Sequence, residues 1–244
     1  MPEKSQKFFI VNAGKKIPVI SPEMIIPYLA AQEYHWREGY SAYELSYCWI
    51  EADSIPLSVQ AVLSRSQFLI DANLVEGFFE YQVNLNTPGH ASQTDLMAII
   101  EAQGRVALLA VEGKVNEGFG SSVRKWNSTP GRDRRISLLC DVLGLFYDDL
   151  ARLKYQLVHR TASAVLEAQR RGIPRATVVI HTFDPSNSHF YDFQCFCDLL
   201  TLPVQAAGQI SEFKTVGGVE LALAWVSDVP RSSRLLQSMP GTSR

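Results

Sequence analysis

Two nearly continuous apolar runs, Leu96–Ile100 and Val106–Val111, lie only five residues apart in this chain. Short apolar runs without polar alternation are typical of central strands that are covered on both faces of a sheet. Between them, Ala102-Gln103-Gly104-Arg105 can form a tight turn. A run rich in Phe, Tyr and Val, Gly77–Leu85, precedes the pair. We therefore expect three successive strands, at least partly antiparallel.

Helical patterns surround these strands and predict an α/β fold. Ser21-Pro22 marks a helix start, and Ser41 to Glu44 has the spacing of a capping box. The remaining expected elements are helices over Leu57–Ser64, Ile136–Leu143, Asp148–Arg171 and 189–200, a strand over Thr177–Ile180, and a hairpin closed by Gly217-Gly218. No composition break suggests a linker, so we expect a single domain over residues 1–244, with flexible tails at 1–7 and 231–244.

The hairpin between the two apolar runs gathers three charged residues. A turn centred between Gln103 and Gly104 places Asp95 opposite Glu112. Directly opposed residues project to the same face, with Cβ atoms ~5 Å apart. Lys114 shares that face because side chains alternate along a strand. A turn longer or shorter by one residue would break this arrangement.

Two carboxylates and an ammonium in this arrangement have a catalytic and a structural interpretation. Repulsion between the carboxylates is relieved by a cation, and Mg²⁺ or Mn²⁺ prefers such oxygen ligands. A bound cation can activate water and stabilise charge on a phosphate, and Lys114 could steer either one. Alternatively, Lys114 only neutralises two carboxylates at the strand ends. The position beside buried strands favours a functional role, because placing charged groups next to buried segments costs free energy.

Asp95, followed by Val111-Glu112-Gly113-Lys114 on the next expected strand, resembles the signature of the PD-(D/E)XK phosphodiesterase superfamily. Segments such as 36–42 and 155–162 also resemble an uncharacterised bacterial family associated with that fold. The resemblance implies a restriction-endonuclease-like core, with a mixed central β-sheet flanked by helices. It also implies a metal held by Asp95, Glu112 and the main-chain carbonyl of Gly113. Thr94 stands where the superfamily name has proline.

Helical residues could complete this site. Superfamily members often add an acidic residue from an earlier helix, and Glu44 is the candidate, although the capping box favours a structural role. The resemblance also matches Gln156 to a glutamine on a helix after the catalytic strand. Gln156, Arg160, Ser163 and Glu167 form a polar stripe on the long helix, which either faces solvent or faces the site. Arg160 would suit a phosphate.

The charge distribution bears on the partner. The chain carries 23 Lys and Arg against 25 Asp and Glu, but residues 121–175 hold 11 basic residues against 5 acidic ones. This excess is either a solvated face or a nucleic-acid footprint that includes Arg132, Arg134 and Arg135. We expect a metal-dependent nuclease or related phosphodiesterase, with DNA favoured over RNA as substrate. The alternative is a nuclease-like fold that only binds or interacts. A homodimer is left open.

The cysteines and the hydropathy suggest a cytoplasmic protein. No apolar stretch approaches the ~18–20 residues of a membrane span, so no membrane partner is expected. The polar N-terminus lacks the apolar segment of a secretory signal. Four cysteines at irregular spacing make no disulfide framework. Zinc binding by Cys195 and Cys197 is disfavoured, because a helix would point the two thiols apart.

Overall fold

The three expected strands form the centre of an eight-stranded mixed sheet in the computed structural model, which describes residues 6–29, 34, 36–129 and 131–238. The strand order is β2-β1-β3-β4-β5-β6-β8-β7. The pairs β3–β4 and β4–β5 are antiparallel, whereas β1–β3, β5–β6 and β6–β8 are parallel. The strands are β1 (Phe8–Asn12), β2 (Lys15–Pro18), β3 (Asn73–Val83), β4 (Ser92–Ala102), β5 (Arg105–Lys114), β6 (Arg175–Thr182), β7 (Lys214–Val216) and β8 (Val219–Ser227).

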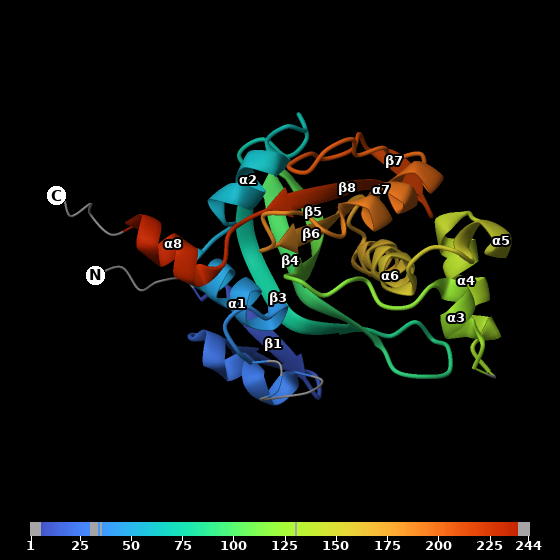
Figure 1. Ribbon diagram of the computed structural model, residues 1–244, viewed down its shortest axis with the longest axis horizontal. Coiled ribbons are helices and arrows are strands. Elements are labelled where there is room, and N and C mark those ends of the chain that lie inside the picture. Colours follow the sequence, from blue (N-terminus) through green and yellow to red (C-terminus); the bar gives the residue numbers. More distant parts are fainter. Residues whose placement is uncertain (1–5, 30–33, 35, 130, 239–244) are drawn as a thin grey trace.

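Helices cover both faces of this sheet (Figure 1). The buried side chains form two separate cores, one on each face. One core packs the sheet against α1 and α2, and the other packs it against α4, α6 and α7. The expected α/β class with a mixed sheet flanked by helices is therefore confirmed. The helices are η1 (Pro22–Tyr28, a 3-10 helix), α1 (Ser41–Ala52), α2 (Leu57–Leu63), α3 (Val123–Asn127), α4 (Asp133–Leu143), α5 (Tyr147–Leu150), α6 (Tyr155–Arg171), α7 (Phe190–Leu199) and α8 (Arg231–Ser238).

The register of the central hairpin is the predicted one. Pairs from Leu96–Val111 to Ala102–Arg105 are all centred between Gln103 and Gly104. Both turn residues have positive φ, 52° and 67°, as a two-residue turn between twisted antiparallel strands requires. The second predicted hairpin, at Gly217-Gly218, joins β7 to β8 with the same sign of φ at both positions.

Three expectations about the elements are wrong. The long helix begins at Tyr155 and not at Asp148, because Ser122 pairs with Lys154 and interrupts it. Helix α1 has Tyr40 at its N-cap, and no side-chain cap bond is made there. The segment from Arg231 is not a frayed tail, since Arg231–Ser238 forms α8. Residues 1–5 and 239–244 of the expected tails lie outside the described residues.

Candidate active site

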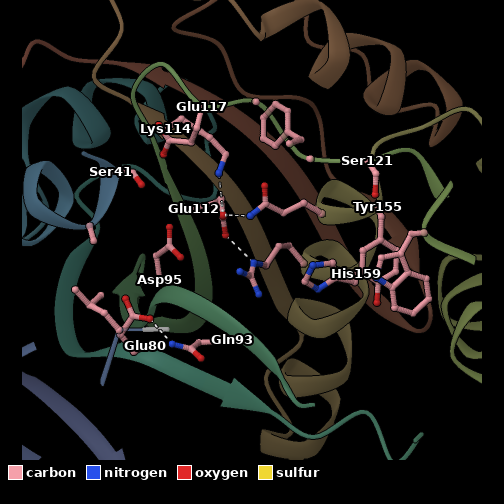
Figure 2. A pocket seen from close by; sticks show the side chains of 18 residues that line it. Ser41, Glu80, Gln93, Asp95, Glu112, Lys114, Glu117, Ser121, Tyr155 and His159 are labelled. Carbon is pink, nitrogen blue, oxygen red and sulfur yellow. Dashed lines mark hydrogen bonds and ion pairs between the residues drawn. The ribbon is translucent and has the colours of Figure 1, made fainter. Parts of the chain in front are cut away.

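The sheet splits between β4 and β5, directly beyond the last pair of the central hairpin. Pairing between the two strands ends at Leu96–Val111. Beyond this point β4 remains paired with β3 as far as Ser92, and β5 with β6 as far as Lys114. A cavity of about 560 Å³ opens at this fork (Figure 2). The predicted residues Asp95, Glu112, Lys114, Gln156 and Arg160 all line it.

Glu112 is the centre of a buried network of charges. Its Oε1 accepts hydrogen bonds from Lys114 Nζ at 3.0 Å and from Gln156 Nε2 at 2.5 Å. Its Oε2 accepts one from Arg160 Nε at 2.6 Å (Figure 2). Burial would raise the pKa of Glu112, but Arg160 and Lys114 outweigh it and hold that pKa below its usual value. The polar stripe of α6 therefore faces the site at Gln156 and Arg160.

Lys114 is the last residue of β5, yet its side chain is buried. Only 4% of the residue is accessible, and its Nζ lies 5.4 Å from the centroid of the Phe119 ring. Burial would lower its pKa, but the charges of Glu112 and Asp95 more than offset this and raise it. Lys114 thus remains a cation inside the cavity.

Asp95 bridges the fork through its side chain. Its Oδ2 accepts a hydrogen bond of 2.8 Å from the Gly113 N–H on β5. Burial, reinforced by the charge of Glu112, raises the pKa of Asp95 to about 7. Gly113 is constrained from the other side of the sheet: a Cβ there would lie 3.3 Å from the Leu45 Cβ of α1. A side chain at residue 113 would therefore require α1 to shift by a few tenths of an ångström.

The sequence patterns missed a third carboxylate, that of Glu80 on β3. Phe79 pairs with Leu96 and Tyr81 with Thr94, so Glu80 and Asp95 are the intervening residues of the two strands. Glu80 lines the same cavity and accepts a hydrogen bond from Gln93. Burial and then the charge of Asp95 raise the pKa of Glu80 to about 8. Only the strand pairing reveals this proximity.

The backbone at Glu80 is unusual for a strand. Its φ of 52° lies in the left-handed region, which costs a non-glycine residue on the order of 1–3 kcal/mol. Phe79 packs in the core beneath α1, whereas Tyr81 packs in the opposite core and donates to Glu167 of α6. Residues two apart in a regular strand share one face. The left-handed residue therefore switches β3 from one face to the other beside the cavity.

The donor set fits a hard divalent cation. Glu80 and Asp95 are carboxyls whose charge is disfavoured by burial and mutual repulsion, which a cation would relieve. Both oxygens of Glu112 already accept hydrogen bonds, so a cation there competes with Lys114, Gln156 or Arg160. Of the predicted ligands, Asp95 and Glu112 line the cavity, and Glu80 adds a third carboxylate there, whereas Gly113 is not among the lining residues.

Glu44 does not line the cavity. It is fully buried and accepts hydrogen bonds from two backbone groups, the N–H of Gly39 at 2.9 Å and the N–H of Arg231 at 2.6 Å. Arg231 is the first residue of α8, so Glu44 holds the start of that helix and the segment before α1. Its position supports the structural interpretation and not the role of a helper in the site.

The three candidate phosphate-binding arginines occupy different environments. Arg134 is exposed, and Arg132 is half-buried with its guanidinium 4.2 Å from the centroid of Trp126. Arg135 is only 7% accessible and donates to the His90 carbonyl at 2.6 Å. The expectation of three surface arginines therefore fails for Arg135, because that side chain is used to hold the loop after β3.

A second cluster with ligand chemistry, Cys48, His181 and Asp228, lies beneath α1, with candidate ligand atoms within 4.8 Å of one another. Trp49 Nε1–H donates to His181 Nδ1 at 3.3 Å. An indole nitrogen only donates, so Nδ1 accepts and Nε2 carries the hydrogen, which points at Asp228 Oδ2 at 3.3 Å. That Nε2 has no lone pair for a metal. Burial also raises the pKa of the Cys48 thiol to about 12, so this cluster is a structural network.

The model of a domain of unknown function, DUF6946, matches residues 18–230. The chain belongs to the DUF6946 family. The match extends from β2 to beyond β8 and so includes every residue of the cavity. Neither the curated proteins nor the solved structures contain a match to the chain. Among the described residues, no helix is long and apolar enough to cross a membrane.

Proposed function

We propose that this DUF6946 protein is a metal-dependent nuclease, or a related phosphodiesterase, built on a restriction-endonuclease-like core. The observation that carries the proposal is the convergence, in one cavity, of the Glu112–Lys114–Arg160 network with the carboxylates of Asp95 and Glu80. An acid-rich pocket would hold a cation, and buried cations beside it would hold a phosphate. A metal-dependent phosphodiester hydrolysis needs both the cation site and the phosphate site.

Each group has a distinct chemical role in this proposal. Asp95, Glu112 and the Gly113 carbonyl would hold Mg²⁺ or Mn²⁺, which when bound supplies a more acidic water and neutralises phosphate charge. Glu80 would add negative charge on the β3 side. Lys114 keeps its proton and offers N–H donors to a phosphate oxygen or to the attacking water. Gln156 orients Glu112, and the fork-shaped guanidinium of Arg160 suits a phosphate.

A direct assay tests the proposal. Purified protein would be incubated with labelled single-stranded DNA, duplex DNA and RNA, each with Mg²⁺, Mn²⁺ or EDTA. We expect cleavage only with a divalent cation, and its loss in Lys114→Met and Glu112→Gln but not in Asp198→Asn, which alters an exposed carboxylate on α7. Absence of cleavage in wild type, or cleavage that survives in the first two variants, would contradict it.

The second candidate is a nuclease-like module that binds without turnover. The specific observation in its favour is that Glu112 is fully satisfied by residues of the protein itself, as a structural ion pair would be. This candidate predicts that Mn²⁺ neither binds at Asp95 nor supports cleavage, while a partner still binds. Metal binding measured directly therefore separates the two.

A further inference from the structure

A column of stacked planar groups begins in one wall of the cavity, with His159, Tyr155 and Trp126, and ends at Arg132, beyond the residues that line it. The centroid of the Tyr155 ring lies 4.6 Å from that of His159 and 3.8 Å from that of Trp126, and the Tyr155 and Trp126 rings are nearly parallel at 8°. The Arg132 guanidinium then lies 4.2 Å from the Trp126 ring centroid. The column thus leads from a half-buried histidine to a half-buried arginine. Its members are separate planar groups that come from α6, from α3 and from the residue before α4.

The column and the charged network belong to the same cavity. Trp126, Tyr155 and His159 line it together with Glu112, Lys114 and Arg160. His159 also hydrogen-bonds Ser92 of β4 through Nδ1 at 2.9 Å, and Arg160 donates to the same hydroxyl at 3.3 Å. The Ser92 hydroxyl therefore links His159 of the column to Arg160 of the charged network. We call Glu112, Lys114 and Arg160 the charged floor of the cavity. A ligand in the cavity would meet an aromatic surface and a cationic floor at once.

The depth of the floor limits what can reach it. Glu112 and Lys114 are 3% and 4% accessible, so a scissile phosphate must enter the cavity to touch them. A base-paired strand cannot leave its helix without breaking pairs, whereas an unpaired nucleotide can be extruded or threaded into a pocket. Planar aromatic groups and arginine planes are the surfaces on which unpaired bases stack.

We propose that the cavity takes an unpaired nucleotide, whose phosphate lies at Lys114 and Arg160 while its base stacks on the Arg132 guanidinium, which ends the column beyond the residues that line the cavity. The inference rests on the proposed nuclease function and names its substrate class as single-stranded or locally unpaired nucleic acid. Arg132 acts here through its plane as well as its charge. Lysine would preserve the charge and lose the stacking.

Binding in EDTA tests the inference without any cleavage. The probes are a fluorescein-labelled oligothymidylate, an abasic oligonucleotide of equal length, and a fully paired duplex. Wild type should bind the oligothymidylate more tightly than the abasic strand by about 5- to 150-fold, the range for one stacked base. Trp126→Ala and Arg132→Lys should erase that ratio. Trp36→Ala, which removes a half-buried tryptophan packed on Tyr43 of α1, and Arg65→Lys, which changes an exposed arginine after α2, should keep it.

The outcomes are distinct. Equal affinity for abasic and base-containing strands, or tighter binding of the duplex, would overturn the stacking inference while leaving the proposed nuclease intact. Binding of no nucleic acid, together with no cleavage, would remove the proposed function and the inference with it. Trp126→Ala could lose its fold, which circular dichroism would reveal, and the ratio in Arg132→Lys then decides.

Discussion

The Asp95 side chain accepts a hydrogen bond of 2.8 Å from the backbone N–H of Gly113, across the point where β4 and β5 separate. A carboxylate thereby replaces the strand partner that this N–H would otherwise have. Removal of the oxygen would leave the N–H of a buried residue unsatisfied, which costs ~1–3 kcal/mol. Asparagine keeps an acceptor there and removes only the charge, so Asp95→Asn is the suitable variant for testing the charge.

Divalent metal should stabilise the protein through Asp95. With Mn²⁺ at about 100 times its dissociation constant, we expect the free energy of unfolding to rise by ~2.7 kcal/mol in wild type. Asp95→Asn should show little rise, and Asp198→Asn should respond as wild type does. Thermal unfolding with Mn²⁺ or EDTA measures this. An equal rise in Asp95→Asn would place the bound metal elsewhere.

Without metal, stability should fall as the pH rises through neutrality. The folded-state pKa values of Asp95 and Glu80 are raised, to about 7 and about 8. The folded state therefore binds more protons than the unfolded chain, and stability is lost from the ordinary carboxyl range upward to these values. In EDTA, Asp95→Asn and Glu80→Gln should raise the melting temperature at about pH 9 but hardly at about pH 5. An equal change in melting temperature at both pH values would contradict the raised pKa values of Asp95 and Glu80.

Lys114 should contribute to stability as well as to cleavage, because it is a buried partner of Glu112. Lys114→Met keeps the aliphatic length but loses the ion pair, at an expected cost of ~1–3 kcal/mol, moderated by Arg160 and Gln156. The double variant with Glu112→Gln should be less destabilised than the two single changes together, with a coupling of ~0.5–3 kcal/mol. Urea denaturation of the four proteins measures it. Strict additivity would show that the pair does not interact.

Glu44 should matter for folding and not for cleavage. Glu44→Ala leaves the N–H groups of Gly39 and Arg231 without their acceptor, so we expect a loss of ~1–3 kcal/mol. The rate of nucleic-acid cleavage by the folded fraction should be unchanged. Denaturation and a cleavage assay on the same preparation separate these effects. A large loss of activity at unchanged stability would return Glu44 to the site.

Arg134 and Arg135 form a matched pair on the same helix. Arg135→Ala should destabilise the protein, because its buried guanidinium holds the His90 carbonyl. Arg134→Ala should leave stability nearly unchanged but flatten the salt dependence of duplex DNA binding by roughly 0.9 log unit if Arg134 contacts a phosphate. Urea denaturation and binding titrations at several salt concentrations provide both readouts. The reverse pattern would contradict the assignment.

The sequence alone determined those features that depend on neighbours in the chain. The register of β4 and β5 follows from a tight turn at Gln103-Gly104, because turn geometry fixes which residues face each other. The same local logic places Glu112 and Lys114 on one face, and puts Gln156 and Arg160 one helical turn apart on α6. The resemblance to the PD-(D/E)XK signature added the metal and the reaction class, which remain proposals.

Only the tertiary structure decided the features that depend on distant segments. The residues around Glu80 in the sequence do not indicate that β3 pairs with the strand that carries Asp95. They also do not indicate that Glu80 has a left-handed backbone conformation. Arg134 and Arg135 look equivalent in sequence, yet the loop at His90 buries one and leaves the other exposed. Lys114 ends a strand but is enclosed, because α6 and the loop carrying Phe119 close over it. Burial and charge pairing arise from contacts between segments far apart in the chain, and the periodicity of the local sequence does not predict such contacts.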